Sequence, residues 1–92
     1  MIAQTLSKDL AQYNIHVNTI SPGMLNSGFH IHNNVMNEEE YKQMLEKQSV
    51  NYPFGIGTPL DIANAIVFLS SEKASWISSA DLLVDGGKLA SR

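Results

Sequence analysis

Apolar residues recur at helical spacing at the start of the chain. Ile2, Leu6 and Leu10 lie four residues apart with polar residues between them, which predicts a helix over residues 1–13. Asn14 marks its expected end, because asparagine tolerates the left-handed conformation that closes many helices. The helical pattern of apolar residues begins at the start of the sequence, and no residue before it could serve as an N-terminal cap.

Two short runs predict β-strands. Residues 15–21 contain four β-branched residues, and we expect Pro22-Gly23 to end this strand, because proline lacks an amide hydrogen and glycine permits unusual dihedrals. Residues 81–85 hold three consecutive apolar side chains, a pattern typical of a strand covered on both faces. Trp76-Ile77, which precedes this strand, is expected to be an apolar anchor, with Trp76 as a packing residue.

Capping residues predict two further helices between the strands. Asn37, followed by Glu40, can form a capping box and open a helix that ends near residue 48. Thr58, with Pro59 and Asp61 after it, opens a helix expected to reach residue 71. Apolar residues surround most of this last helix, so we expect it to be buried on more than one side.

The order helix, strand, two-helix connection, strand predicts an α/β fold. Strands joined by a helical crossover are expected to be parallel neighbours. In open parallel sheets, ligands bind beyond the carboxyl ends of the strands. The turn at Pro22-Gly23 is therefore the first place to look for a ligand site.

Composition narrows the classes of function. The 92 residues carry a net charge of −3 with no basic stripe, which argues against nucleic acid and against binding to an acidic membrane surface. No apolar run reaches the roughly 20 residues that cross a bilayer. Cysteine is absent, which excludes thiolate metal sites. A metal site at the loop histidines His30 and His32 would need a third ligand such as Glu38 or Glu39. Isolated loop histidines are common, so we expect no metal site. A cytoplasmic location is the expectation.

Four segments resemble motifs of the short-chain dehydrogenase/reductase family. Residues 15–23 resemble the family's I-x-V-N-x-x-x-P-G segment, and residues 57–63 its G-x-P-E-E-I-A helix start. Residues 68–71 resemble F-L-A-S, and residues 76–87 resemble Y-I-T-G-Q-x-L-x-V-D-G-G. The segments occur in the family's order. Ser79 and Ala80 stand where the family has Gly-Gln. If that glycine has positive φ, a serine in its place would cost about 1 kcal/mol, which puts the local turn in doubt but not the fold.

The resemblance implies a doubly wound Rossmann sheet and an oxidoreductase that uses NAD or NADP on a small alcohol or carbonyl compound. Pro22, Gly23, Leu25 and Ser27 would line the nicotinamide site, with the Leu25 backbone at the carboxamide and the Ser27 hydroxyl close by. Residues 28–56 would form the substrate lid. The family habit also implies a dimer or tetramer.

Several of the family's functional groups have no counterpart in the chain. There is no phosphate-binding glycine loop between a strand and a helix, no Tyr-x-x-x-Lys pair and no match to the catalytic serine. We therefore interpret residues 1–92 as the C-terminal part of one Rossmann-type domain, with no catalytic residue of its own. Alone, it is expected to be molten or aggregated and to bind no cofactor. The alternative is a non-catalytic short product that binds related subunits through oligomer surfaces.

Overall fold

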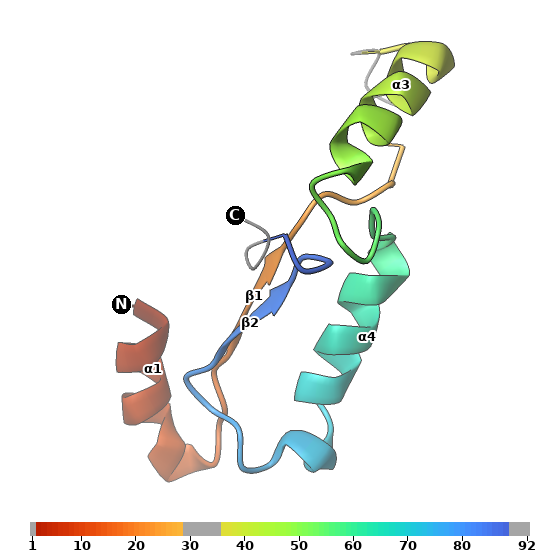
Figure 1. Ribbon diagram of the computed structural model, residues 1–92. Coiled ribbons are helices and arrows are strands. Elements are labelled where there is room, and N and C mark those ends of the chain that lie inside the picture. The colour runs from red at the N-terminus through yellow and green to blue at the C-terminus, as the bar shows by residue number, and fades with distance from the viewer. Residues whose placement is uncertain (1, 29–35, 89–92) are drawn as a thin grey trace.

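The computed structural model describes residues 2–28 and 36–88. The elements, in chain order, are α1 (Ile2–Leu10), the 3₁₀ turn η1 (Ala11–Tyr13), β1 (Thr19–Pro22), α3 (Glu38–Ser49), α4 (Pro59–Leu69), the 3₁₀ turn η2 (Glu72–Ala74) and β2 (Asp81–Val84). Helices α1 and α4 flank two short strands, and helix α3 lies beyond the carboxyl ends of those strands (Figure 1).

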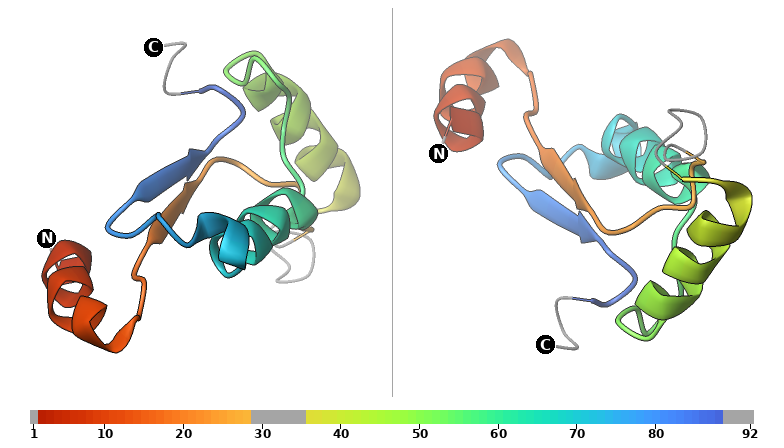
Figure 2. Two further views of the ribbon diagram at one scale, coloured as in Figure 1. Left: turned by 90° about the horizontal axis from the view of Figure 1, so that it is seen from below. Right: turned by 90° about the horizontal axis from the view of Figure 1, so that it is seen from above.

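The two strands form a parallel pair. Thr19 lies opposite Asp81, and Pro22 lies opposite Val84. In both views of Figure 2 the strands lie between α1 and α4, and α4 contacts both strands. This arrangement confirms the predicted α/β class. The ends of both strands lie next to the turn that follows α3, where the Phe54 amide donates to the Gly86 carbonyl at 3.0 Å.

The predicted caps explain where the helices begin and end. The Asn37 side chain accepts a hydrogen bond from the Glu40 amide at 2.8 Å, and the Glu40 side chain accepts one from the Asn37 amide at 3.5 Å. At α4, the Asp61 carboxylate accepts from the amide of Thr58 at 2.8 Å and from its hydroxyl at 3.2 Å. Asn14 is left-handed, with φ of 59°, as predicted.

Strand β1 is shorter than predicted, and Pro22 is its last residue rather than its terminator. The Thr19 amide donates to the carbonyl of Ala80, the residue before β2, at 2.9 Å, and the Gly23 amide donates to the Val84 carbonyl at the end of β2 at 3.0 Å. Successive residues of a strand direct their backbone groups to alternate edges, so the Pro22 nitrogen lies on the edge away from β2. A proline is tolerated there because no donor is needed.

Side chains and turns hold residues 15–18 in place of strand pairing. The Asn18 side chain accepts from the Ala80 amide at 3.0 Å and donates to the Ile77 carbonyl at 3.4 Å. Asn18 therefore has a structural role in this turn. Ser79, which replaces the family's glycine, adopts a φ of 64°, and its amide donates to the Val17 carbonyl at 2.8 Å. The turn therefore keeps a left-handed residue although a serine occupies it.

The expectation of thorough burial is wrong for the chain by itself. Trp76 is 99% exposed, and on α4 Leu60 and Val67 are 65% and 67% exposed. β2 is exposed at three of its four residues. A two-stranded sheet with one helix against it can cover only part of its apolar surface. In the described residues, the buried hydrophobic side chains are Tyr41, Tyr52 and Ala74.

Candidate functional site

The backbone that leaves β1 passes very close to β2 at Gly23. A Cβ atom placed on Gly23 would lie 2.9 Å from the Asp85 Cα and 2.9 Å from the Tyr52 Cε1. The first of these atoms belongs to backbone and cannot move aside without shifting the strand end. Only glycine fits at position 23, because any Cβ would clash with this backbone. Its position fixes the start of residues 23–28, which we call the post-β1 segment.

The middle of the post-β1 segment pairs with Gly57. The Gly57 amide donates to the Met24 carbonyl at 3.2 Å, and the Asn26 amide donates to the Gly57 carbonyl at 2.7 Å. These two bonds form an isolated parallel bridge between Leu25 and Gly57. In such a bridge the N–H and C=O of the residue between the two bonded ones face the opposite edge. Leu25 therefore presents a backbone donor and acceptor away from Gly57, and neither has a hydrogen-bond partner within residues 2–28 and 36–88.

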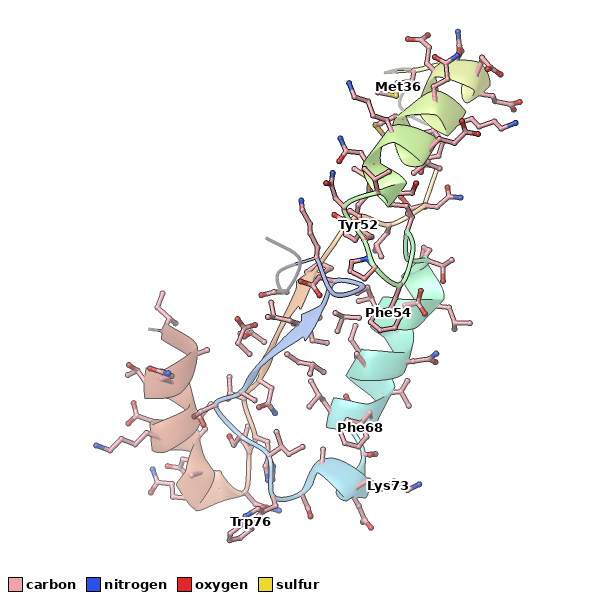
Figure 3. The ribbon with its side chains drawn as sticks, in the orientation of Figure 1. Met36, Tyr52, Phe54, Phe68, Lys73 and Trp76 are labelled. Carbon is pink, nitrogen blue, oxygen red and sulfur yellow. The ribbon has the colours of Figure 1, made fainter. Side chains whose placement is uncertain are left out.

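Two buried tyrosine hydroxyls hold the ends of the same segment. The Met24 amide donates to the Tyr52 hydroxyl at 2.9 Å, and the Gly28 amide donates to the Tyr41 hydroxyl at 3.2 Å. Each tyrosine is only 6% exposed. Tyr41 lies on α3, and Tyr52 lies between the end of α3 and the strands (Figure 3). The segment is thus fixed to the α3 region at both ends.

A cavity of about 310 Å³ lies beside the segment, between the turn of residues 54–57, the first turns of α4 and the end of β2. Leu25 contributes to its wall, and its polar side chains are Asp61, Asn64 and Asp85. This volume is near the lower end for small-molecule pockets. The cavity can hold a small group next to Leu25.

The structure places the four residues predicted to line the nicotinamide site along one connected stretch of backbone. Pro22 is exposed at the end of β1, Gly23 is packed against β2, Leu25 carries the open backbone edge, and Ser27 is exposed two residues further on. Which of them contacts a cofactor stays a prediction. Their shared position beyond a strand's carboxyl end is the place where ligands bind in open parallel sheets.

Three residues that shape this stretch escaped the sequence reasoning. From the sequence, Tyr41 is expected to pack, with contact to a substrate in the lid as the alternative. Tyr52 has no expected role at this site, and Gly57 was noted only as the first residue of the helix-start motif. Tyr41 is indeed buried, but its hydroxyl also binds backbone. The available signals were weak: a glycine before a helix cap, and two tyrosines in an otherwise polar stretch. Neither pattern reveals that its residue meets the post-β1 segment, because these contacts join residues that lie 13 apart (Tyr41 and Gly28), 28 apart (Tyr52 and Met24) and 33 apart (Gly57 and Met24).

Two further features bear on function. Within the described ranges, no group of three or more His, Cys, Asp or Glu residues could hold a metal ion. The pair His30 and His32 lies outside the described residues. None of the helices in residues 2–28 and 36–88 is long and apolar enough to cross a membrane.

A parallel pair of strands, a helical crossover and a ligand-facing loop beyond the first strand define a Rossmann-type α/β protein. A family model described as enoyl-(acyl carrier protein) reductase matches residues 1–88. With the relatives described next, this match shows that the chain belongs to the short-chain dehydrogenase/reductase family.

Characterised relatives are oxidoreductases. The chain is 40% identical over 84 residues to a 3-oxoacyl-[acyl-carrier-protein] reductase, FabG, from Buchnera aphidicola, covering 91% of this chain and 32% of the relative. It is 36% identical over 86 residues to the 7alpha-hydroxysteroid dehydrogenase of Escherichia coli, covering 94% and 32%. The chain therefore spans about a third of the length of the curated relatives it matches.

Solved structures agree on the fold. A short chain dehydrogenase family protein from Francisella tularensis superposes with a TM-score of 0.77 and 26% identity, covering 97% of this chain and 39% of the other. A 4-hydroxyisoleucine dehydrogenase, solved in complex with NADH and succinate, superposes with a TM-score of 0.74 and 25% identity, covering 97% and 34%. The Rossmann-type fold expected from the sequence is confirmed.

Proposed function

We propose that this chain supplies the nicotinamide-side wall of an NAD(P)-dependent oxidoreductase that interconverts a hydroxyl and a carbonyl group on a small molecule. The observation that carries the proposal is the open backbone edge of Leu25 beyond β1. Membership of a family of dehydrogenases and reductases supports the reaction class.

The groups present fit one end of a nicotinamide cofactor. Its carboxamide has an NH₂ donor and a C=O acceptor, which complement the C=O and N–H of Leu25. The Ser27 hydroxyl, two residues later in the chain, is a further partner for the carboxamide or a phosphate. When bound, the cofactor transfers hydride to or from the substrate carbon. The role of the post-β1 segment is to hold and orient the nicotinamide end.

The proton at the substrate oxygen must come from groups outside this chain. Tyr13, Tyr41 and Tyr52 are followed four residues later by Val17, Leu45 and Ile56, so none forms the family's Tyr-x-x-x-Lys pair. In this proposal residues 28–56, which include α3, form the substrate lid. A dimer or tetramer and a cytoplasmic location belong to the same proposal and rest on the sequence and the family habit.

A hybrid protein tests the proposal. The complete 92-residue chain replaces the matching last third of the E. coli 7alpha-hydroxysteroid dehydrogenase, and binding of NAD⁺ and NADP⁺ is measured by calorimetry. We expect one of them to bind at least fivefold more tightly than its 3-acetylpyridine analogue, which lacks the NH₂ donor, on the basis of about 1 kcal/mol for one hydrogen bond. Equal affinity for both would refute the contact with Leu25.

Ser27→Ala in the hybrid tests the second contact. We expect it to weaken dinucleotide binding severalfold through loss of one hydroxyl hydrogen bond. The matched control is Ser71→Ala, because the Ser71 hydroxyl caps the end of α4 by donating to the Phe68 carbonyl at 2.6 Å. An equal effect of the two substitutions would show that Ser27 acts through general stability.

The exposed apolar surface supports a second candidate, a non-catalytic chain that binds related subunits. Leu60 and Val67 on α4 and Leu83 on β2 are all about half exposed or more. Native mass spectrometry of the endogenous protein, combined with copurification, would identify a complex between the 92-residue species and a full-length family member. If only a longer polypeptide containing these residues is found, this candidate fails.

A further inference from the structure

The two tyrosine contacts suggest a role beyond packing. Tyr52 and Tyr41 are the two buried aromatic side chains of the described residues, and each directs its hydroxyl to a backbone N–H of the post-β1 segment. The contacts fall at Met24 and Gly28, which flank both residues proposed to meet the cofactor. Neither hydroxyl is needed simply to fill space, since a phenylalanine would fill the same volume.

Tyr52 decides which way Leu25 faces. Both backbone groups of Met24 make hydrogen bonds. Its N–H donates to the Tyr52 hydroxyl at 2.9 Å, and its C=O accepts from the Gly57 amide at 3.2 Å. With both groups of Met24 engaged, the next residue must turn its N–H and C=O to the other edge. The hydroxyl of Tyr52 therefore favours the orientation in which the Leu25 pair is available to a ligand.

The Tyr52 ring is itself well fixed. It lies against Gly23 and within 3.5 Å of the position a Cβ on Gly86 would occupy, and the Lys88 ammonium lies 5.4 Å from the ring centroid. Residues from the ends of both strands thus surround it. A hydroxyl carried by such a ring has little freedom, so its hydrogen bond defines the Met24 position closely.

Tyr41 connects the opposite end of the segment to the lid. It is the buried residue of α3, and its hydroxyl accepts from the Gly28 amide at 3.2 Å. A displacement of α3 would therefore pull on the residue next to Ser27. The geometry links the position of α3 to the backbone that carries the proposed cofactor contacts.

We propose that Tyr52 and Tyr41 are positioning residues that hold the post-β1 segment in its nicotinamide-binding orientation and couple it to α3. This inference rests on the proposed function, because it assumes that Leu25 binds the carboxamide. Tyr52 acts on the orientation of Leu25, and Tyr41 acts on Ser27 and on the connection to the lid. Neither tyrosine touches the reacting atoms.

The test uses Tyr52→Phe and Tyr41→Phe in the hybrid protein. The matched control is Tyr13→Phe, because Tyr13 lies on η1 and is 67% exposed. Three affinities are measured for each variant: the preferred dinucleotide, its 3-acetylpyridine analogue, and ADP-ribose or its 2′-phosphorylated form, which lacks the nicotinamide. The ratio of the first two reports the carboxamide contact, and the third reports the integrity of the remaining site.

We expect Tyr52→Phe to reduce the preference for the carboxamide about fivefold, in proportion to one lost hydrogen bond, with the ADP-ribose affinity unchanged. Tyr41→Phe is expected to weaken the dinucleotide severalfold, also without loss of ADP-ribose binding. The control should change none of the three.

Each other outcome has a distinct meaning. If Tyr52→Phe lowers all three affinities together, the tyrosine is structural and the inference is wrong. If both tyrosine variants match the parent, the inference is also wrong while the proposed function stands. If the parent hybrid binds ADP-ribose but shows no carboxamide preference, the proposed function itself fails. Should Tyr52→Phe not fold, Tyr41→Phe decides the coupling by the same three measurements.

Discussion

The sharpest prediction concerns the chain when it is isolated from any other polypeptide. A compact monomer of 10.1 kDa is expected to expose about 5,300 Å², whereas this chain exposes 6936 Å². Its radius of gyration is 16.5 Å, against about 12 Å for a compact domain of this length. Both comparisons indicate a surface too large for an independent domain.

The excess of roughly 1,600 Å² can be expressed as a free energy. If somewhat more than half of that surface is apolar, the burial forgone is about 20 kcal/mol at 25 cal/mol per Å². Native domains of this size are stable by only about 5–15 kcal/mol. The deficit is larger than the whole stability expected, so we predict that the lone chain does not reach a cooperative native state.

Calorimetry, 8-anilinonaphthalene-1-sulfonate fluorescence and size-exclusion chromatography check this prediction. The lone chain should show no cooperative heat-absorption peak, should bind the dye and should elute as an expanded or aggregated species without affinity for NAD(P)H. The hybrid protein, in which the same residues have the relative's strands beside them, should melt in one transition. A monomeric 92-residue chain with one sharp melt would refute the reasoning.

The remaining predictions use unfolding of the hybrid in urea. Gly23→Ala should lower the free energy of unfolding by about 1–3 kcal/mol, because the new Cβ would clash with the backbone at the end of β2. Gly55→Ala should lower it by only about 1 kcal/mol, because the space around Gly55 is open although its φ is 83°. A larger loss for Gly55→Ala than for Gly23→Ala would contradict the contact argument. Asn37→Ala should remove about 1 kcal/mol by deleting the α3 cap; an unchanged midpoint would show that α3 does not depend on it. Ser79→Gly should stabilise by roughly 0.5 kcal/mol by relieving positive φ; a loss of stability would show that the serine side chain matters more than strain.

Local features were predictable from the sequence for a physical reason. The capping box at Asn37, the start of α4 at Thr58 and the left-handed Asn14 each depend on interactions within a few residues. The parallel pairing of the strands followed from the length and helical content of their connection. Local hydrogen bonding and chain connectivity leave few alternatives at these positions.

Burial and fine geometry were less predictable. Trp76 and the faces of α4 have the composition of buried elements, but burial depends on which other segments cover them, and this chain does not provide enough covering surface. β1 includes Pro22, which was predicted to end the strand, because the Pro22 nitrogen lies on the edge of β1 where no amide donor is needed. A pattern of apolar residues records what a segment is suited to contact, not whether the contact is available.

The sequence by itself determined the family, the α/β order and the stretch of chain from Pro22 to Ser27 where a cofactor is expected. Only the tertiary structure decided that Leu25 turns its backbone pair outward, that Gly57 holds the other edge, and that two tyrosine hydroxyls fix the ends of the segment. The reason is distance along the chain: the contact between Tyr52 and Met24 joins residues 28 positions apart. No local pattern encodes such a meeting, because it exists only once α3 and both strands are in place.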